Sequence, residues 1–377
     1  MKPHSSRSQL PQKIVWLSIL AAATALLNSF LPLTATAEVF FSQSQPVNLP
    51  SLSVSTTPLP AREPERFRTI SSYASLLKIS PNQKILAGFL AYNHTIQLWD
   101  IETGAELLSL KIQPQLISTL AFSPDGNTLA SSSYAFDTQT LTIQLWNLQT
   151  GTLLKTLSTI SPPVLHRGES GAWGYISSCA LAWSPDGKTL ASTSGGNTVQ
   201  LWDVARSSIR FTLKGHIEAV RSLAFSPDGQ TLASGGINGT LKLWVVNRGQ
   251  SIRTLRGTAD PFQMAFSSDG QTLATAVNAT AGNPDRGVQF WNLSTGKPRQ
   301  LVPLPKDAAI AFSADGTTYA WANSQVGTTL VDLATNQALR SFKLYSSDIT
   351  LSHDGQLIAA IGGSGIEIWH SSKLSLN

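Results

Sequence analysis

The histidines and the single cysteine of this 377-residue chain do not have the spacing of a metal site. The six histidines are His4, His94, His166, His216, His353 and His370. No two of them form a His-x-x-x-His or similar pattern. Cys179 is the only cysteine, which excludes an intramolecular disulfide and a cysteine-based zinc site. It alternates with Leu181 and Trp183, which predicts a buried, inert thiol; a reactive, exposed thiol is the alternative.

Nucleophile and phosphate motifs are also missing from the sequence. There is no Gly-x-Ser-x-Gly elbow and no glycine-rich phosphate loop. Most aspartates fall in recurring turn sequences, where a carboxylate caps backbone groups. The sequence therefore predicts a protein that is not an enzyme and has no cofactor and no metal. A site assembled from several loops would leave no such spacing, and that alternative stays open.

The turn sequences belong to a repeat that recurs seven times. Residues 220–225 form a short, roughly alternating apolar run, which predicts a strand. Ser226-Pro-Asp-Gly229 predicts a turn, because proline presets φ and glycine accepts a positive φ. Strands are expected at residues 231–234, 241–245 and 251–255, with a tight hairpin at Asn238-Gly239. Four antiparallel strands in about 40 residues are one blade of a β-propeller.

The other copies of the turn are Ser80-Pro-Asn-Gln83, Ser123-Pro-Asp-Gly126, Ser184-Pro-Asp-Gly187, Ser267-Ser-Asp-Gly270, Ser313-Ala-Asp-Gly316 and Ser352-His-Asp-Gly355. The third strand carries a tryptophan in six of the seven copies. The sixth copy along the chain has Val331 in that position. The tryptophans are Trp99, Trp146, Trp202, Trp244, Trp291 and Trp369. The repeat predicts an all-β, seven-bladed propeller whose tryptophans lie in the core.

With Leu98-Trp-Asp100, Leu145-Trp-Asn147, Leu201-Trp-Asp203 and Gly215-His216, the chain resembles the WD-repeat β-propeller family over residues 65–377. That resemblance implies a hydrogen-bonded tetrad of His, Ser, Asp and Trp in a blade. Only the fourth blade comes close, with His216, Ser234, Asn238 and Trp244. The fifth blade keeps Asp285 but lacks the Gly-His pair. We therefore expect apolar packing between blades to replace most tetrads.

The last repeat lacks its fourth strand, because only residues 370–377 follow Trp369. Residues 66–70, near the start of the repeat region, resemble the fourth strand at residues 252–255. We expect this N-terminal segment to be the outer strand of the last blade, which closes the ring and removes an open edge.

Residues 1–37 have a basic front, an apolar run and the sequence Ala35-Thr-Ala37, which predict a secretory signal peptide. An uncleaved anchor is the alternative. Residues 38–64 are rich in Pro, Ser and Thr, which predicts a flexible linker. The expected location is secreted or periplasmic, with no stable membrane span after cleavage. Without residues 1–37 the chain has 24 basic and 22 acidic residues, which does not favour a nucleic-acid partner.

Three insertions enlarge the repeat, at residues 133–140, 160–174 and 278–287. In WD-repeat propellers these connections open on one face, and insertions on one face often bind partners. Aromatic residues that are out of phase with the repeat suggest a partner-binding patch. The predicted patch comprises Trp173, Tyr175, His166, Arg167, Tyr134 and Phe136. The alternative for Trp173 is packing between blades two and three.

These features predict a monomeric, non-catalytic, extracytoplasmic scaffold that binds a protein or peptide on the loop-bearing face. The alternative is an extracytoplasmic propeller enzyme or a glycan-binding protein with its site at the channel mouth.

Overall fold

The structure is a computed structural model, and the residues that it describes form one compact unit. It describes residues 66–371 apart from 113–116, 136–137, 161–164, 168–172, 176–178, 194–195, 258, 279–285, 306 and 347. The predicted leader (1–37), the predicted linker (38–64) and Asp285 lie outside the described residues. The described part of the chain contains no helix that is long and apolar enough to cross a membrane.

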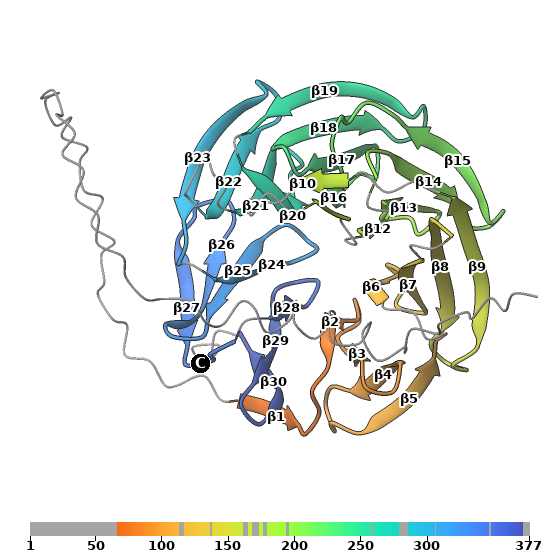
Figure 1. The fold of residues 1–377 in the computed structure, drawn as a ribbon. Coiled ribbons are helices and arrows are strands. Elements are labelled where there is room, and N and C mark those ends of the chain that lie inside the picture. Colours follow the sequence, from red (N-terminus) through yellow and green to blue (C-terminus); the bar gives the residue numbers. More distant parts are fainter. Residues whose placement is uncertain are drawn as a thin grey trace, which may run out of the picture. The chain divides into compact units, whose positions relative to one another are not determined.

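Seven sheets, each of four antiparallel strands, surround a central channel, as the repeat predicts (Figure 1). Each sheet is one blade, and its first strand lies innermost (Figure 1). From the inside outwards, the strands of blades one to seven are β2 (Ser75–Ile79), β3 (Ile85–Leu90), β4 (Thr95–Asp100) and β5 (Glu106–Lys111); β6 (Ile117–Phe122), β7 (Thr128–Ala135), β8 (Thr140–Asn147) and β9 (Leu153–Ile160); β12 (Leu181–Trp183), β13 (Thr189–Thr193), β14 (Val199–Asp203) and β15 (Ser208–Leu213); β16 (Val220–Phe225), β17 (Thr231–Gly236), β18 (Thr240–Val245) and β19 (Gln250–Arg256); β20 (Asp260–Phe266), β21 (Thr272–Asn278), β22 (Gly287–Asn292) and β23 (Lys297–Pro303); β24 (Ala309–Phe312), β25 (Thr318–Asn323), β26 (Gly327–Asp332) and β27 (Ala338–Phe342); β28 (Ile349–Leu351), β29 (Leu357–Gly362), β30 (Gly365–His370) and β1 (Arg66–Ile70).

The repeated turn explains why each first strand folds back onto the second. In blade four the amide of Gly229 donates to the carbonyl of Ser226 over 2.8 Å, and Gly229 has φ 69°. The hydroxyl of Ser226 donates to Asp228 Oδ1 over 2.5 Å and accepts the amide of Thr231 over 2.9 Å. A left-handed φ favours glycine, so serine, aspartate and glycine together specify the turn.

The N-terminal strand closes the ring, which confirms the sequence prediction. β1 pairs antiparallel with β30, with Arg66 opposite Trp369 and Ile70 opposite Ile366. Figure 1 shows β1 as the outermost strand of the last blade, beside β30. Ile70 is 6% exposed and packs in the cluster that joins blades seven and one. The closing strand therefore contributes both ladder hydrogen bonds and apolar burial.

The core consists of seven apolar clusters, and each one joins two neighbouring blades. In one of them Leu201 and Leu213 of blade three pack with Leu232 and Trp244 of blade four. The predicted core position is confirmed for five of the six repeat tryptophans, which are at most 5% exposed, whereas Trp369 is only partly buried. Trp183 is also only partly buried, and it lines the channel. Cys179 is buried as predicted, but it precedes β12 rather than lying within it.

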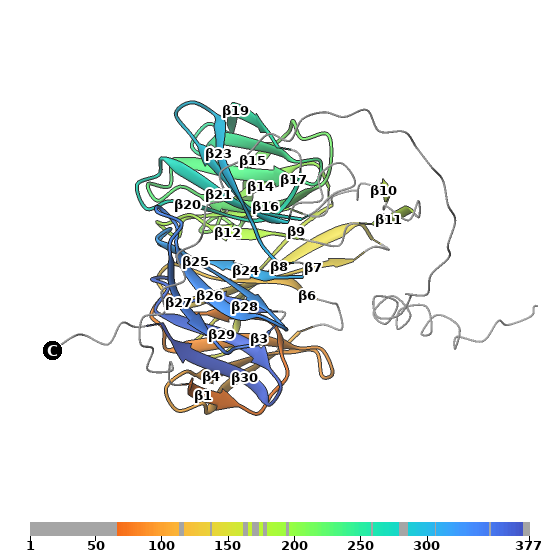
Figure 2. The ribbon, with the colours of Figure 1, turned by 90° about the vertical axis from the view of Figure 1, so that its left-hand side faces the viewer.

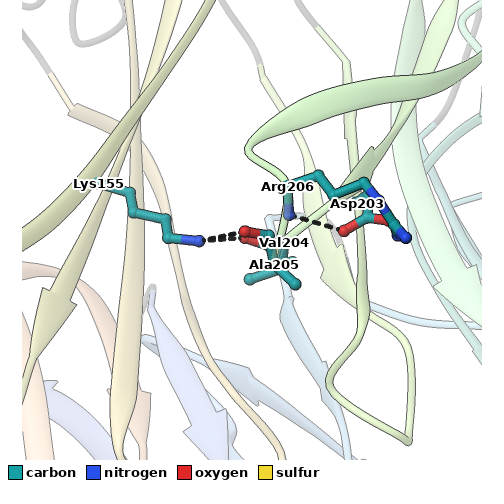
Figure 3. Close-up of polar contacts among 5 residues, drawn as sticks. All are labelled: Lys155, Asp203, Val204, Ala205 and Arg206. Carbon is teal, nitrogen blue, oxygen red and sulfur yellow. Dashed lines mark hydrogen bonds and ion pairs between the residues drawn. The ribbon is translucent and has the colours of Figure 1, made fainter.

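Cations on outer strands also tie blades together. Figure 3 shows Nζ of Lys155, on β9 of blade two, donating to the carbonyls of Val204 and Ala205 over 2.6 and 2.9 Å. These carbonyls lie in the β14–β15 turn of blade three. Arg253 makes the corresponding contacts from blade four to the carbonyls of Leu293 and Ser294 in blade five, over 2.9 and 3.1 Å. Lys155 and Arg253 occupy equivalent positions, opposite Leu145 and Leu243 of the third strands.

Candidate interaction surface

The antiparallel blades give the propeller two unlike faces. One face, here the turn face, carries the turns between first and second strands and between third and fourth strands. The other, here the loop face, carries the turns between second and third strands and the connections from blade to blade. Five of the six predicted binding residues belong to described strands at the loop face, in β7, β10 (Leu165–Arg167) and β11 (Trp173–Tyr175).

Two of the three insertions project from this face. β7 and β8 are eight residues each, and most second and third strands are shorter. The connection from blade two to blade three contains a hairpin that the sequence did not predict, β10 (Leu165–Arg167) with β11 (Trp173–Tyr175). Figure 2 shows this hairpin beyond the face on which the tips of β7 and β8 extend. The third insertion lies mostly outside the described residues.

The structure brings four of the six predicted patch residues into the β10–β11 hairpin. Arg167 pairs with Trp173, Leu165 pairs with Tyr175, and His166 pairs with Gly174. Tyr134 lies in the neighbouring insertion, opposite Leu141 of β8. Phe136 lies outside the described residues, as do the side chains of the other five. That these six side chains are exposed and lie together in one patch therefore stays a prediction.

Exposed apolar side chains of the described loops gather on the same face. They are Tyr92 (78% exposed), Ile217 (77%), Tyr73 (65%), Val326 (63%) and Tyr345 (49%), and Ile160 (75%), the last residue of the outer strand β9, lies at the same face. The other large apolar residues that are exposed in the described part lie on outer strands, for example Leu107 and Leu154. The described turns of the turn face expose none. This asymmetry distinguishes the loop face as a surface with unburied aromatic groups.

Sequence reasoning missed the loop-face tyrosines because it searched only connections of unusual length. Tyr92 lies in the regular β3–β4 turn, and Tyr345 lies in the connection from blade six to blade seven. Tyr73 follows the closing strand, and its hydroxyl donates to the carbonyl of Gly363 over 3.0 Å. The available signal was an aromatic residue in a turn position, where polar residues are usual.

In the fourth blade three residues of the predicted tetrad are linked by hydrogen bonds. Ser234 Oγ lies 2.7 Å from His216 Nε2, and it accepts the indole N–H of Trp244 over 2.8 Å. Asn238 Oδ1 instead accepts the amide of Thr240 over 3.1 Å, and His216 Nδ1 has no partner among the described residues. Burial, helped by Lys242, lowers the pKa of His216 to about 4. The imidazole is therefore neutral at pH 7.

Half of this network recurs in blades that lack the histidine. The indole N–H of Trp146, Trp202 and Trp291 donates to a second-strand hydroxyl, over 3.1, 2.8 and 3.2 Å respectively. Apolar packing between blades therefore replaces most tetrads, as expected. In these three blades one hydrogen bond of the tetrad, from the tryptophan to the second-strand hydroxyl, is still present. These bonds position the tryptophans within the core.

The turn aspartates and Cys179 have structural roles. The Ser123 hydroxyl and the Asn127 amide lower the pKa of Asp125, and equivalent turn groups do the same at Asp186 and Asp228. Burial raises the pKa of the Cys179 thiol to about 11, which makes the thiolate a minor species at neutral pH. No group of three or more metal-ligating side chains occurs within the described ranges.

Comparison with known proteins identifies the repeats. A family model described as "WD domain, G-beta repeat" matches residues 107–147, 166–203 and 207–245. The first and third matches begin in, or one residue before, the outer strand of one blade and end with the third strand of the next. The sequence repeat is thus offset from the structural blade by one strand, which is why the N-terminal strand must complete the last blade.

Three relatives illustrate the similarity. The chain is 33% identical to WD repeat and SOCS box-containing protein 1 of Danio rerio over 254 residues, which cover 64% of this chain and 54% of that protein. It is 29% identical to WD repeat-containing protein VIP3 of Arabidopsis thaliana over 140 residues (37% and 42%). It is 26% identical to WD repeat-containing protein slp1 of Schizosaccharomyces pombe over 172 residues (45% and 33%). The chain therefore spans about half or less of these relatives.

The comparison corrects the predicted location. The secreted or periplasmic location is wrong on this comparison, because the matched WD-repeat relatives are intracellular and point to the cytoplasm or nucleus. The prediction depended only on the basic, apolar and small residues of 1–37, a local pattern in which no propeller residue takes part. Fold and relatives together lead to one identification: the chain is a seven-bladed β-propeller that contains WD40 repeats.

Proposed function

We propose that this protein is a non-catalytic scaffold whose loop face binds a protein or peptide partner. The observation that carries the proposal is the distribution of exposed apolar groups, since Tyr92, Tyr73 and Tyr345 all lie in loop-face connections. Tyrosine and tryptophan supply much of the binding free energy in protein interfaces. WD-repeat proteins commonly act as platforms for protein interactions, which agrees with this role.

The β10–β11 hairpin is the second part of the proposed surface. Trp173, Tyr175, His166 and Arg167 belong to it, and Tyr134 and Phe136 belong to the neighbouring insertion. Insertions on one face of a repeat protein are a common place for binding residues. The protein acts as a monomer and needs no nucleic acid in this proposal.

The test compares two double variants in affinity capture from a native extract, with bound proteins quantified by mass spectrometry. Tyr92→Ser with Tyr345→Ser removes loop-face aromatics, whereas Leu107→Ser with Leu154→Ser removes two exposed apolar groups of the outer strands. We expect only the first pair to lose specific partners. If only the outer-strand variant loses its partners, the binding surface lies on the outer strands, which contradicts the proposal.

Trp173→Ala tests the hairpin. If Trp173 is a binding hot spot, its removal weakens partner affinity by about 2 kcal/mol or more, which is roughly thirtyfold. The melting temperature stays at the wild-type value, because the hairpin pairs only with itself. A lowered melting temperature with unchanged partner capture would instead make Trp173 a packing residue.

A further inference from the structure

The turn-face end of the central channel is a largely apolar cavity that is partly open to solvent. It has a volume of about 450 Å³, and its lining includes residues of all seven blades. Five blades place an aromatic side chain there, in each case the residue just before the turn serine: Phe122, Trp183, Phe225, Phe266 and Phe312. Turn prolines such as Pro124 and Pro185 also line it, so this end opens at the turn face. A volume of this size is typical of small-molecule sites, which take roughly 300–1,000 Å³.

One blade breaks the apolar pattern with a cation. Ala121, Ala182 and Ala224 line the cavity from equivalent positions, each opposite an alanine of the second strand. The equivalent residue of blade one is Lys78, opposite Ala87. The chain therefore places one ammonium group in a ring of methyl groups.

Among the residues that the structure describes, the ammonium of Lys78 interacts with the charge of Asp348 but makes no hydrogen bond or ion pair. Burial lowers the pKa of Lys78, and the charge of Asp348 opposes that effect. Asp348 lies one residue before β28 and two residues before Thr350, which occupies the row of Lys78. A desolvated charge without a hydrogen-bonded counter-ion costs free energy, and an anion in the cavity would remove that cost.

We propose that the turn-face end of the channel binds a small organic anion that has a flat apolar body and one carboxylate. The carboxylate pairs with Lys78, and the apolar body packs between aromatic walls such as Phe225 and Trp183. His353 lines the same cavity from the blade-seven turn and offers a second polar contact. This site is separate from the loop face, so it stands or falls independently of the proposed scaffold function.

The test uses three ligands of one shape with the purified full-length protein in isothermal titration calorimetry at fixed ionic strength. 2-Naphthoate carries the carboxylate, 2-naphthamide is its neutral counterpart, and 2-naphthylmethylammonium is the cation. We expect saturable 1:1 binding of naphthoate, at least about tenfold tighter than the amide, because a charge-assisted hydrogen bond is worth more than a neutral one. Absence of binding, or equal affinity for acid and amide, would overturn the proposal.

Variants assign the selectivity to Lys78. Lys78→Met should bring the naphthoate affinity down to that of the amide, while Lys188→Met, an exposed lysine of the turn face, should leave both unchanged. Since Lys78→Met leaves Asp348 without its nearby cation, Lys78→Met with Asp348→Asn serves as the second variant. If a folded form of either variant still prefers naphthoate tenfold, Lys78 is not the anion-binding group.

Discussion

At the scale of single residues, hydrogen bonds between blades join positions that are far apart in the chain, so no local sequence pattern predicts them. Nζ of Lys155 binds two carbonyls about 50 positions away in the chain. We expect Lys155→Met, which keeps most of the apolar stem, to destabilise the protein by about 1 kcal/mol, because two charge-assisted hydrogen bonds are lost at a partly exposed site. Thermal unfolding should show a melting temperature that is a few degrees lower.

Arg206→Met is the matched control for Lys155→Met. Arg206 pairs with Asp203 inside the same turn (Figure 3), and 79% of its side chain is exposed. Exposed pairs of this kind contribute little to stability. We expect no change in melting temperature, and a larger effect at Arg206 than at Lys155 would refute the importance of ties between blades.

A second residue-scale prediction concerns acid sensitivity. The pKa of His216 falls from 6.5 to about 4 on folding, so the unfolded chain binds more protons between these values. Stability must then decrease as pH falls from about 6.5 to 4, by roughly 1.4 kcal/mol per pH unit at most. Thermal melts of the wild type and His216→Gln from pH 7.5 to 4.5 should show a flatter decline in the variant. Parallel curves would show that His216 does not contribute.

At the scale of strands and turns, much of the fold could be predicted from sequence. Ser226, Asp228 and Gly229 make the bonds that their types imply, and the same residues recur in phase. The tie at Lys155 and the cation at Lys78 could not be predicted, because each depends on which blade lies beside which strand. The β10–β11 hairpin was missed for a different reason, since its strands are three residues long and lie outside the repeat.

The closing strand gives the prediction at this scale. Deletion of residues 1–72 removes β1 and leaves β30 as an open edge beside the apolar cluster that contains Ile70. We expect the melting temperature to fall by many degrees, because ladder hydrogen bonds and buried apolar area are both lost. Deletion of residues 1–65 keeps β1 and is the control, and it should melt like the full chain. Equal melting of the two deletions would exclude a closing role for β1.

At the scale of the whole molecule, closure makes every blade depend on two neighbours. The seven clusters each join consecutive blades, and the last one joins blade seven to blade one. An open array of repeats can unfold from its ends, since terminal repeats have only one neighbour. A closed ring has no such end, so we expect the propeller to unfold in a single cooperative transition.

Leu232→Ala tests this cooperativity. Leu232 is fully buried between blades three and four, so its truncation should cost about 2–5 kcal/mol. Leu154→Ala, on the exposed outer strand of blade two, is the control and should change stability little. Because the blades are coupled around the ring, Leu232→Ala should shift one transition seen alike by tryptophan fluorescence and far-ultraviolet circular dichroism. Two separate transitions in Leu232→Ala would mean that blades three and four unfold independently, and that closure does not couple the ring.

The 1–72 deletion combined with Leu232→Ala should broaden or split the transition, since the opened ring has terminal blades with only one neighbour each.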